Sequence, residues 1–215
     1  MRRPTGQDWH VDLLPDFVRA CREAGATASD DELEDAGTTL LRRWSEPARG
    51  YHAVLHLTEV LTRLDEIGER AAVTRLAAWF HDAVYEGLPG QDERDSAELA
   101  MRSLATLGVP PVSAAEVAAL VLVTADHVPR DPHGAALCDA DLAVLASPPE
   151  RHAAYVAGVR REYSHVDDDA FRAGRAAVLA DLLGREHLFS TDHGRRHWDA
   201  PARANLAAEL AHLSS

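Results

Sequence analysis

Apolar residues recur every three or four positions along almost the whole chain, which is the period of one face of an α-helix. Near the N-terminus, for example, one such stripe precedes Gly25 and consists of Leu13, Leu14, Phe17, Val18 and Cys21. Apolar and polar residues do not alternate over a stretch long enough for a strand, and no internal repeat is visible. The pattern therefore predicts an all-α protein.

Capping signals and helix breakers divide this pattern into about nine or ten helices. Capping boxes are expected at residues 29–32, 113–116 and 147–150, where a serine and a glutamate would satisfy free backbone amides at a helix start. Glycine and proline are expected to end helices, as at Gly68 and in the loop 87–90. The predicted helices cover residues 13–24, 30–46, 51–67, 69–85, 92–107, 113–127, 135–146, 149–165, 168–185 and 199–213.

Length and composition fit one globular domain. The chain has 215 residues, 46% of them hydrophobic, and nothing in it is typical of a linker. Its net charge of -13 argues against a nucleic-acid polymer or an anionic membrane as a partner, because both need a basic surface. A small phosphorylated substrate remains compatible with this charge, since a bound divalent cation can dominate the local field.

Cysteine use and the N-terminal residues indicate a cytoplasmic protein. Cys21 and Cys138 lie far apart in different apolar contexts, which is typical of free buried thiols in a reducing compartment. The first residues, MRRPTGQDWH, lack the apolar segment of a signal peptide, and no apolar run approaches the ~18 residues of a membrane span. Apolar helices near the C-terminus could complete the core or form a homodimer interface, and the sequence leaves both open.

Histidine and aspartate residues stand on successive apolar helices. His52 and His56 are four positions apart, so on one helix they would share a face. His81 and Asp82 end an apolar helix, where two polar side chains entering a core need a compensating partner such as a cation.

A further pair of carboxylates follows in the segment CDADL, residues 138–142. Asp139 and Asp141 lie there in apolar surroundings, where carboxylates are costly unless they are bound or hydrogen-bonded. A single histidine or a His-Asp pair is common without a metal. The ordered set of histidine, His-Asp and a distant aspartate is far more specific and predicts a divalent-metal site.

These motifs resemble the HD-domain superfamily of metal-dependent phosphohydrolases. More narrowly, the chain is similar to a bacterial branch of predicted HD phosphohydrolases with an RxYHxxxH opening, an FHDxVY middle and a DADL segment. The YHxxxH opening also resembles that of the cyclic-nucleotide phosphodiesterases, which share the metal core. The matching segments are YHAVLHLTEV (51–60), AAWFHDAVYE (77–86), ERDSA (93–97), DADLAVL (139–145), VRREY (159–163), GR (174–175) and ARANL (202–206).

The resemblance implies a single HD-type helical domain over residues 1–215, with a catalytic core at about 40–165 and the terminal helices packed on it. It also implies that His56, His81 and Asp82 ligate one divalent transition metal, together with one carboxylate of the DAD segment. Asp141 is the expected fourth ligand, and Asp139 is the alternative, which otherwise caps or orients. Such nitrogen and oxygen ligands are compatible with Mn, Fe, Co, Ni or Zn.

Further residues receive expected roles around this metal. The resemblance to the phosphodiesterases implies that His52 is a proton donor beside the metal. The alternative is that His52 only supports a residue that binds the metal. Glu93 is expected to act as a general base or to orient water, or else to be a solvated glutamate at a helix start. Arg49 is expected to clamp a phosphate, and His127 to contact substrate, to hold a second metal, or to be satisfied at a helix end. Three arginines are expected to anchor helix packing: Arg160, Arg175 and Arg203.

The function implied by the resemblance is hydrolysis of a small phosphate ester, a nucleotide or related metabolite, through a metal-activated water. Two other classes stay open. A diiron oxygenase of HD type would need extra histidines between His81 and the last aspartate, where the chain offers His127 and His133. A metal-stabilised module that binds or regulates without catalysis is the other alternative.

Overall fold

The fold is all-helical, as predicted, in a computed structural model that describes residues 9–213. Within this range there is no β-strand, and none of the helices combines the length and hydrophobicity that a membrane crossing requires. Cys21 and Cys138 are both buried and free, as expected. Residues 1–8, which carry most of the segment used to judge a signal peptide, lie outside the described range.

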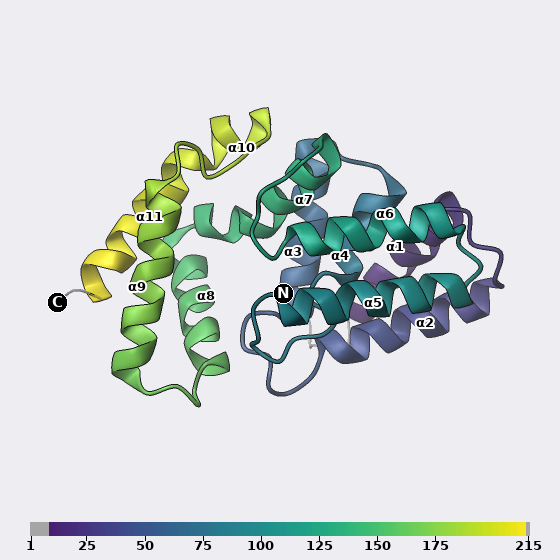
Figure 1. The fold of residues 1–215 in the computed structure, drawn as a ribbon, viewed down its shortest axis with the longest axis horizontal. Helices are drawn as coiled ribbons and strands as arrows, with labels where there is room; N and C mark the ends of the chain where they lie inside the picture. The colour runs from purple at the N-terminus through teal and green to yellow at the C-terminus, as the bar shows by residue number, and fades with distance from the viewer. Residues whose placement is uncertain (1–8, 214–215) are drawn as a thin grey trace, which may run out of the picture.

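Eleven α-helices and one 3₁₀ helix make up the described chain (Figure 1). Their bounds are α1 (Trp9–Glu23), α2 (Asp30–Trp44), α3 (Val54–Ile67), α4 (Ala72–Phe80), α5 (Gln91–Thr106), α6 (Pro111–Val123), α7 (Pro132–Leu142), η1 (Ala143–Ala146), α8 (Pro149–Glu162), α9 (Asp168–Gly184), α10 (Asp192–His197) and α11 (Asp199–Leu213).

Helices α1 to α7 share one hydrophobic core. In it α1 packs against α2 and α4, α5 lies along α6, and α3 packs on α7. Fully buried aromatic side chains occupy its centre, among them Phe17, Trp44, Trp79 and Phe80. In α2 and α3, for example, the sequence places apolar residues on one side of the helix, so their burial here is the packing that the hydrophobic period requires.

The C-terminal helices form a second core, which lies at the left in Figure 1. Helix α11 packs on α9 and on the 3₁₀ helix, and Leu179, Phe189 and Trp198 are buried among them. Tyr51 also belongs to this cluster, although it precedes α3. The loop before α3 therefore joins the two cores.

Several helix starts differ from the predicted ones. The capping box of α2 is present, since Oγ of Ser29 accepts from the amide of Glu32 at 3.3 Å and a carboxylate oxygen of Glu32 accepts from the amide of Ser29 at 2.7 Å. Helix α6, however, begins at Pro111 and not at Ser113, because proline is well suited to a first helical position. Helix α8 begins at Pro149 without a side-chain cap, and the hydroxyl of Ser147 donates instead to a backbone carbonyl.

The extra helix beyond the predicted nine or ten is α10, in a region predicted to be a polar loop. Thr191 caps it by accepting a hydrogen bond from the amide of Gly194 at 3.0 Å. Its sequence, DHGRRH, contains no apolar residue. Hydrophobic periodicity therefore could not reveal this helix.

Two glycines allow the loop before α3 to touch α8. A Cβ atom on Gly50 would lie 2.1 Å from the carbonyl oxygen of Gly158, and one on Gly158 would lie 3.0 Å from the carbonyl oxygen of Gly50. Neither position has room for a side chain while the backbones stay in place. The contact brings Glu162, at the end of α8, beside this loop.

Candidate metal centre

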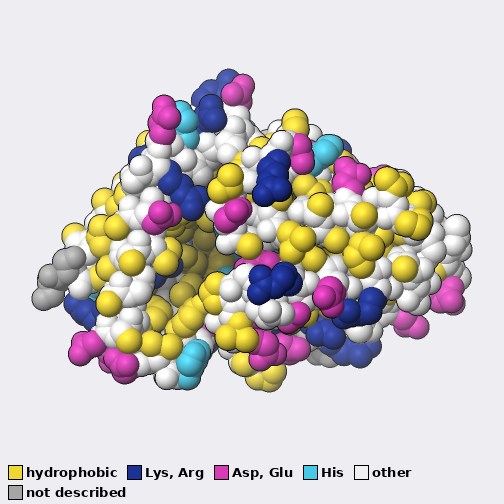
Figure 2. All heavy atoms as spheres, in the orientation of Figure 1, with side chains coloured by type: hydrophobic (Ala, Val, Ile, Leu, Met, Phe, Trp, Pro, Cys, Tyr) yellow, Lys and Arg dark blue, Asp and Glu magenta, His cyan; other side chains and the backbone are white. Residues whose placement is uncertain are grey.

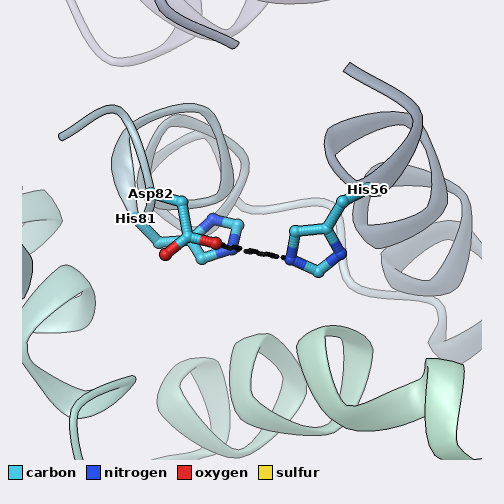
Figure 3. A group of neighbouring side chains, drawn as sticks. All are labelled: His56, His81 and Asp82. Carbon is cyan, nitrogen blue, oxygen red and sulfur yellow. Dashed lines mark hydrogen bonds and ion pairs between the residues drawn. The ribbon is translucent and has the colours of Figure 1, made fainter. Parts of the chain in front are cut away.

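Two buried histidines form the centre of the candidate site. His56 lies in the first turn of α3 and His81 caps the end of α4, with their Nε2 atoms 3.1 Å apart (Figure 3). The hydroxyl of Tyr51 lies 2.8 Å from Nδ1 of His56, and the carbonyl of Ala78 lies 2.8 Å from Nδ1 of His81. A carbonyl only accepts, so Nδ1 of His81 carries a proton, and a neutral His81 presents the lone pair of Nε2 to the site.

Two carboxylates meet these nitrogens. Oδ2 of Asp82, in the turn after α4, lies 3.1 Å from Nε2 of His81 and 3.6 Å from Nε2 of His56. Oδ1 of Asp141, on α7, lies 3.0 Å from Nε2 of His56 and 3.6 Å from Nε2 of His81. His56, His81 and Asp82 each offer a ligand atom within 4.8 Å of the others, and Asp141 adds an oxygen beside them.

The electrostatics of this group require a positive charge. Burial lowers the pKa of His56, which is therefore neutral. Burial also acts to lower the pKa of His81, but Asp82 and Asp141 outweigh it and hold that pKa well above its usual range. Burial raises the pKa of Asp82, and the neighbouring His81 charge reverses this and lowers it. A divalent cation would supply the same positive charge to these nitrogen and oxygen donors, so the residues fit a transition metal.

The structure separates the two aspartates of the DAD segment. Asp139 is 1% exposed, and its carboxylate accepts from the amides of Ser190 and Thr191 at 2.7 and 2.8 Å. The hydroxyl of Thr191 donates to the same carboxylate at 2.7 Å. Asp139 therefore anchors the segment before α10, and Asp141 is the aspartate that lies against the histidines.

His127 orients Asp141. Its Nε2 lies 2.8 Å from Oδ2 of Asp141, the oxygen on the far side from His56. Its backbone φ of +51° lies in the left-handed region, which non-glycine residues seldom adopt. His127 thus serves as a partner of a candidate ligand, at the edge of the cavity described below.

His52 points to a different neighbour from His56. Helix α3 begins at Val54, so the expectation that His52 and His56 share one helix face is wrong. Nδ1 of His52 lies 2.8 Å from Oε2 of Glu162, and its ring stacks on Tyr85 with centroids 4.1 Å apart. Because the carboxylate accepts at Nδ1, the nitrogen of His52 left for chemistry is Nε2.

Glu162 is a site residue that received no role in the sequence analysis. Its Oε1 accepts from the amides of residues 50, 51 and 52 at 2.7, 2.7 and 2.9 Å. Burial raises the pKa of Glu162, but the hydrogen bonds from His52 and these amides outweigh it and lower the pKa to about 2. A glutamate as the last residue of a helix interacts unfavourably with the helix dipole. This unfavourable position is the sequence feature that could have marked Glu162 as a residue with a specific partner.

Arg49 does not contact the cavity. Its side chain is 2% exposed, and Nη1 donates to the carbonyls of His52 and Asp82 at 2.8 and 2.7 Å. Nη2 donates to the carbonyl of Ala83 at 3.3 Å. The expected phosphate clamp is therefore wrong for Arg49, because its guanidinium is committed to backbone carbonyls; it instead holds the His52 loop to the Asp82 turn.

Glu93 lines the cavity from the first turn of α5. One of its carboxylate oxygens accepts from the amide of Gly90 at 2.6 Å, so it caps the helix as a helix-start glutamate does. Glu93 thus caps its helix, as one of the two expectations had it, and it also lines the cavity.

The three other arginines anchor helices, as expected. Arg160 donates to the carbonyls of Tyr163 and Val166. Arg203 binds Asp199, one carbonyl in the last turn of α9 and two carbonyls just after it. Arg175 binds Glu209 of α11 through two hydrogen bonds of 2.7 and 3.1 Å. Arg175 also lines the cavity.

A cavity of about 580 Å³ opens beside the candidate ligands. Figure 2 shows it as a hollow between the C-terminal helices and the rest of the molecule. Its polar end contains His52, Asp82, Glu93, His127 and Asp141. Two of the four candidate ligands, Asp82 and Asp141, thus line an open space large enough for a small-molecule ligand, and His56 and His81 lie buried behind them.

Comparison of the chain with protein-family models, with curated proteins and with solved structures found no match in any of the three. The function is therefore inferred from the chemistry of this site and from the motifs that form it.

Proposed function

We propose that this protein is a metal-dependent hydrolase of small phosphate esters, of the HD-domain type. The observation that carries the proposal is the convergence of two buried imidazole Nε2 atoms with two carboxylates that line an open cavity. The resemblance of the HAVLH, FHD and DADL segments to the HD-domain superfamily supports the same assignment.

His56, His81, Asp82 and Asp141 would hold the cation. A divalent metal there would polarise a phosphoryl oxygen and lower the pKa of a bound water. His52 would act as the proton donor: the Glu162 carboxylate holds its ring through Nδ1, and when the ring is protonated Nε2 would give its proton to the departing oxygen. Glu93, which also lines the polar end of the cavity, is a candidate to orient water.

The residues favour a single metal over a diiron oxygenase site. His133, one of the two additional histidines considered for such a site, is 41% exposed and pairs with Glu69 at 3.0 Å. Of these two histidines, His127 is the one that lies near the candidate metal ligands, where it contacts Asp141. The size of the adjoining cavity favours a catalytic role over a purely structural metal.

The proposal is tested by metal content and phosphate release. Wild-type protein should retain a divalent cation and release phosphate from a panel of phosphate esters with at least one of Mn, Fe, Co, Ni or Zn. His81→Ala should lose both properties, because a buried ligand is removed. His187→Ala is the matched control, since that side chain is 49% exposed and lies outside the site. Unchanged metal retention and activity in His81→Ala would refute the proposal.

A further inference from the structure

The cavity beside the candidate metal centre is polar at one end and apolar at the other. The apolar wall comes from α8, α9 and the turn between them, and includes Tyr155, Val159, Val166, Phe171 and Val178. Figure 2 shows hydrophobic side chains around this part of the hollow. A liquid water occupies about 30 Å³, so a volume of about 580 Å³ holds a phosphoryl group and an organic body several times larger.

Positive charge is scarce along this wall. Among the described residues that line the cavity, Arg175 is the one arginine or lysine. Its guanidinium is bound by Glu209 at 2.7 and 3.1 Å and lies 5.1 Å over the Tyr155 ring. Asp92 and Glu93 add negative charge near the polar end. A chain of several phosphates needs arginine or lysine contacts along its length, and this wall does not supply them.

We infer that the substrate carries a single phosphoryl group joined to an apolar or aromatic body. The phosphoryl group occupies the polar end beside Asp82 and Asp141, and the body lies against the side chains of α8 and α9. This inference rests on the proposed phosphohydrolase function and specifies its substrate class. Phosphate esters with long apolar bodies are preferred over short ones, and polyphosphates are poor substrates.

Gly174 offers a way to fill the apolar end without disturbing the fold. It lies in α9 and lines the cavity, and a Cβ atom added there would meet nothing within 4 Å. Glycine is unfavourable inside a helix, so a larger residue is tolerated by the backbone. Gly184, at the end of the same helix, also has open space around an added Cβ but does not line the cavity. It is the matched control.

The test uses the metal-loaded full-length protein and two series of ligands. Hydrolysis of n-alkyl phosphates from ethyl to hexyl and of tripolyphosphate is measured by phosphate release. Binding of the corresponding alkylphosphonates is measured by calorimetry. Burying one methylene group should raise kcat/KM, and the affinity for the phosphonate, by up to about fourfold. Gly174→Phe should remove most of this gain, whereas Gly184→Phe should retain it.

The possible outcomes separate the two proposals. Hydrolysis that is independent of chain length, or fastest with tripolyphosphate, overturns the substrate class and leaves the phosphohydrolase function standing. A chain-length gain that persists in Gly174→Phe also overturns the inference, because the apolar body then lies elsewhere. Failure to hydrolyse any ester with any of the metals overturns the proposed function, and with it the inference that rests on it.

Discussion

Replacing Glu162 by glutamine tests the most highly connected carboxylate near the site. The substitution keeps the shape of the side chain, but it removes the charge and turns one acceptor oxygen into a donor. In the native protein Oε1 accepts three amides and Oε2 accepts Nδ1 of His52. Whichever way the amide group of Glu162→Gln turns, its NH₂ group faces either the three backbone amides or Nδ1 of His52, and both of these are donors. We therefore expect lower stability and a displaced His52 ring.

The pKa of Glu162 gives the expected magnitude. Its side chain is 3% exposed, and its hydrogen bonds outweigh burial to lower the pKa from an ordinary 4.5 to about 2. A shift of this size corresponds to a contribution of about 3 kcal/mol near neutral pH. A carboxyl group whose pKa is lowered in the folded protein stabilises the fold at pH values above its pKa in the unfolded chain. This stabilisation is lost as the pH falls through the pKa of the folded protein. The contribution should therefore shrink to about 1 kcal/mol by about pH 3.

Urea unfolding followed by circular dichroism checks this expectation near pH 7, 5 and 3. The difference in unfolding free energy between wild type and Glu162→Gln should be largest near neutral pH and fall below about pH 4.5. Glu116→Gln is the control: Glu116 is exposed on α6, and its loss of charge should change stability by less than about 0.5 kcal/mol at each pH. A difference for Glu162→Gln that is small, or that does not vary with pH, would refute the reasoning.

Four further substitutions separate structural from functional contacts. Asp139→Asn should lower the unfolding free energy by about 1–3 kcal/mol, because it weakens the anchor of Ser190 and Thr191, yet leave metal content unchanged in elemental analysis. Gly50→Ala should cost about 2 kcal/mol or more in urea unfolding, since its Cβ would lie 2.1 Å from a backbone oxygen, whereas Gly174→Ala should be neutral or stabilising. Arg49→Met should reduce kcat in the phosphate-release assay more than it changes KM, because it frees the His52 loop without touching the cavity.

The helices were predictable where hydrophobic residues determine them. Helices α9 and α11 agree with the prediction to within a residue or so, and Ser29 and Glu32 form the predicted cap. The predicted helix starts and caps were wrong where backbone hydrogen bonding determines them. The capping boxes at 113–116 and 147–150 did not form: α6 begins at Pro111, two residues before Ser113, and the hydroxyl of Ser147 donates to the carbonyl of Val144 although α8 begins at Pro149 as predicted. Helix α10, DHGRRH, has no apolar stripe, so its sequence gave no periodic signal.

The type and order of the side chains predicted a metal site, and the resemblance to the HD-domain superfamily then implied which histidines and aspartates would form it. His56, His81, Asp82 and Asp141 were named from the sequence, and the structure places them within reach of one another. Glu162 received no role, since its main partners are backbone amides of a loop more than a hundred positions away. Amides and carbonyls are present at almost every residue, so the sequence does not show which of them a buried charge will bind.

The peptide groups around His52 show how such contacts position a site. Its amide donates to the carboxylate of Glu162 at 2.9 Å, and its carbonyl accepts from the guanidinium of Arg49 at 2.8 Å. The same guanidinium binds the carbonyl of Asp82 at 2.7 Å. The residue proposed to move a proton and a residue proposed to hold the metal are thus tied together through one buried cation, and one buried anion holds the His52 loop to α8. The position of His52 depends on these charges. Conservative substitutions of Arg49 or Glu162 should therefore reduce catalysis even in variants that stay folded.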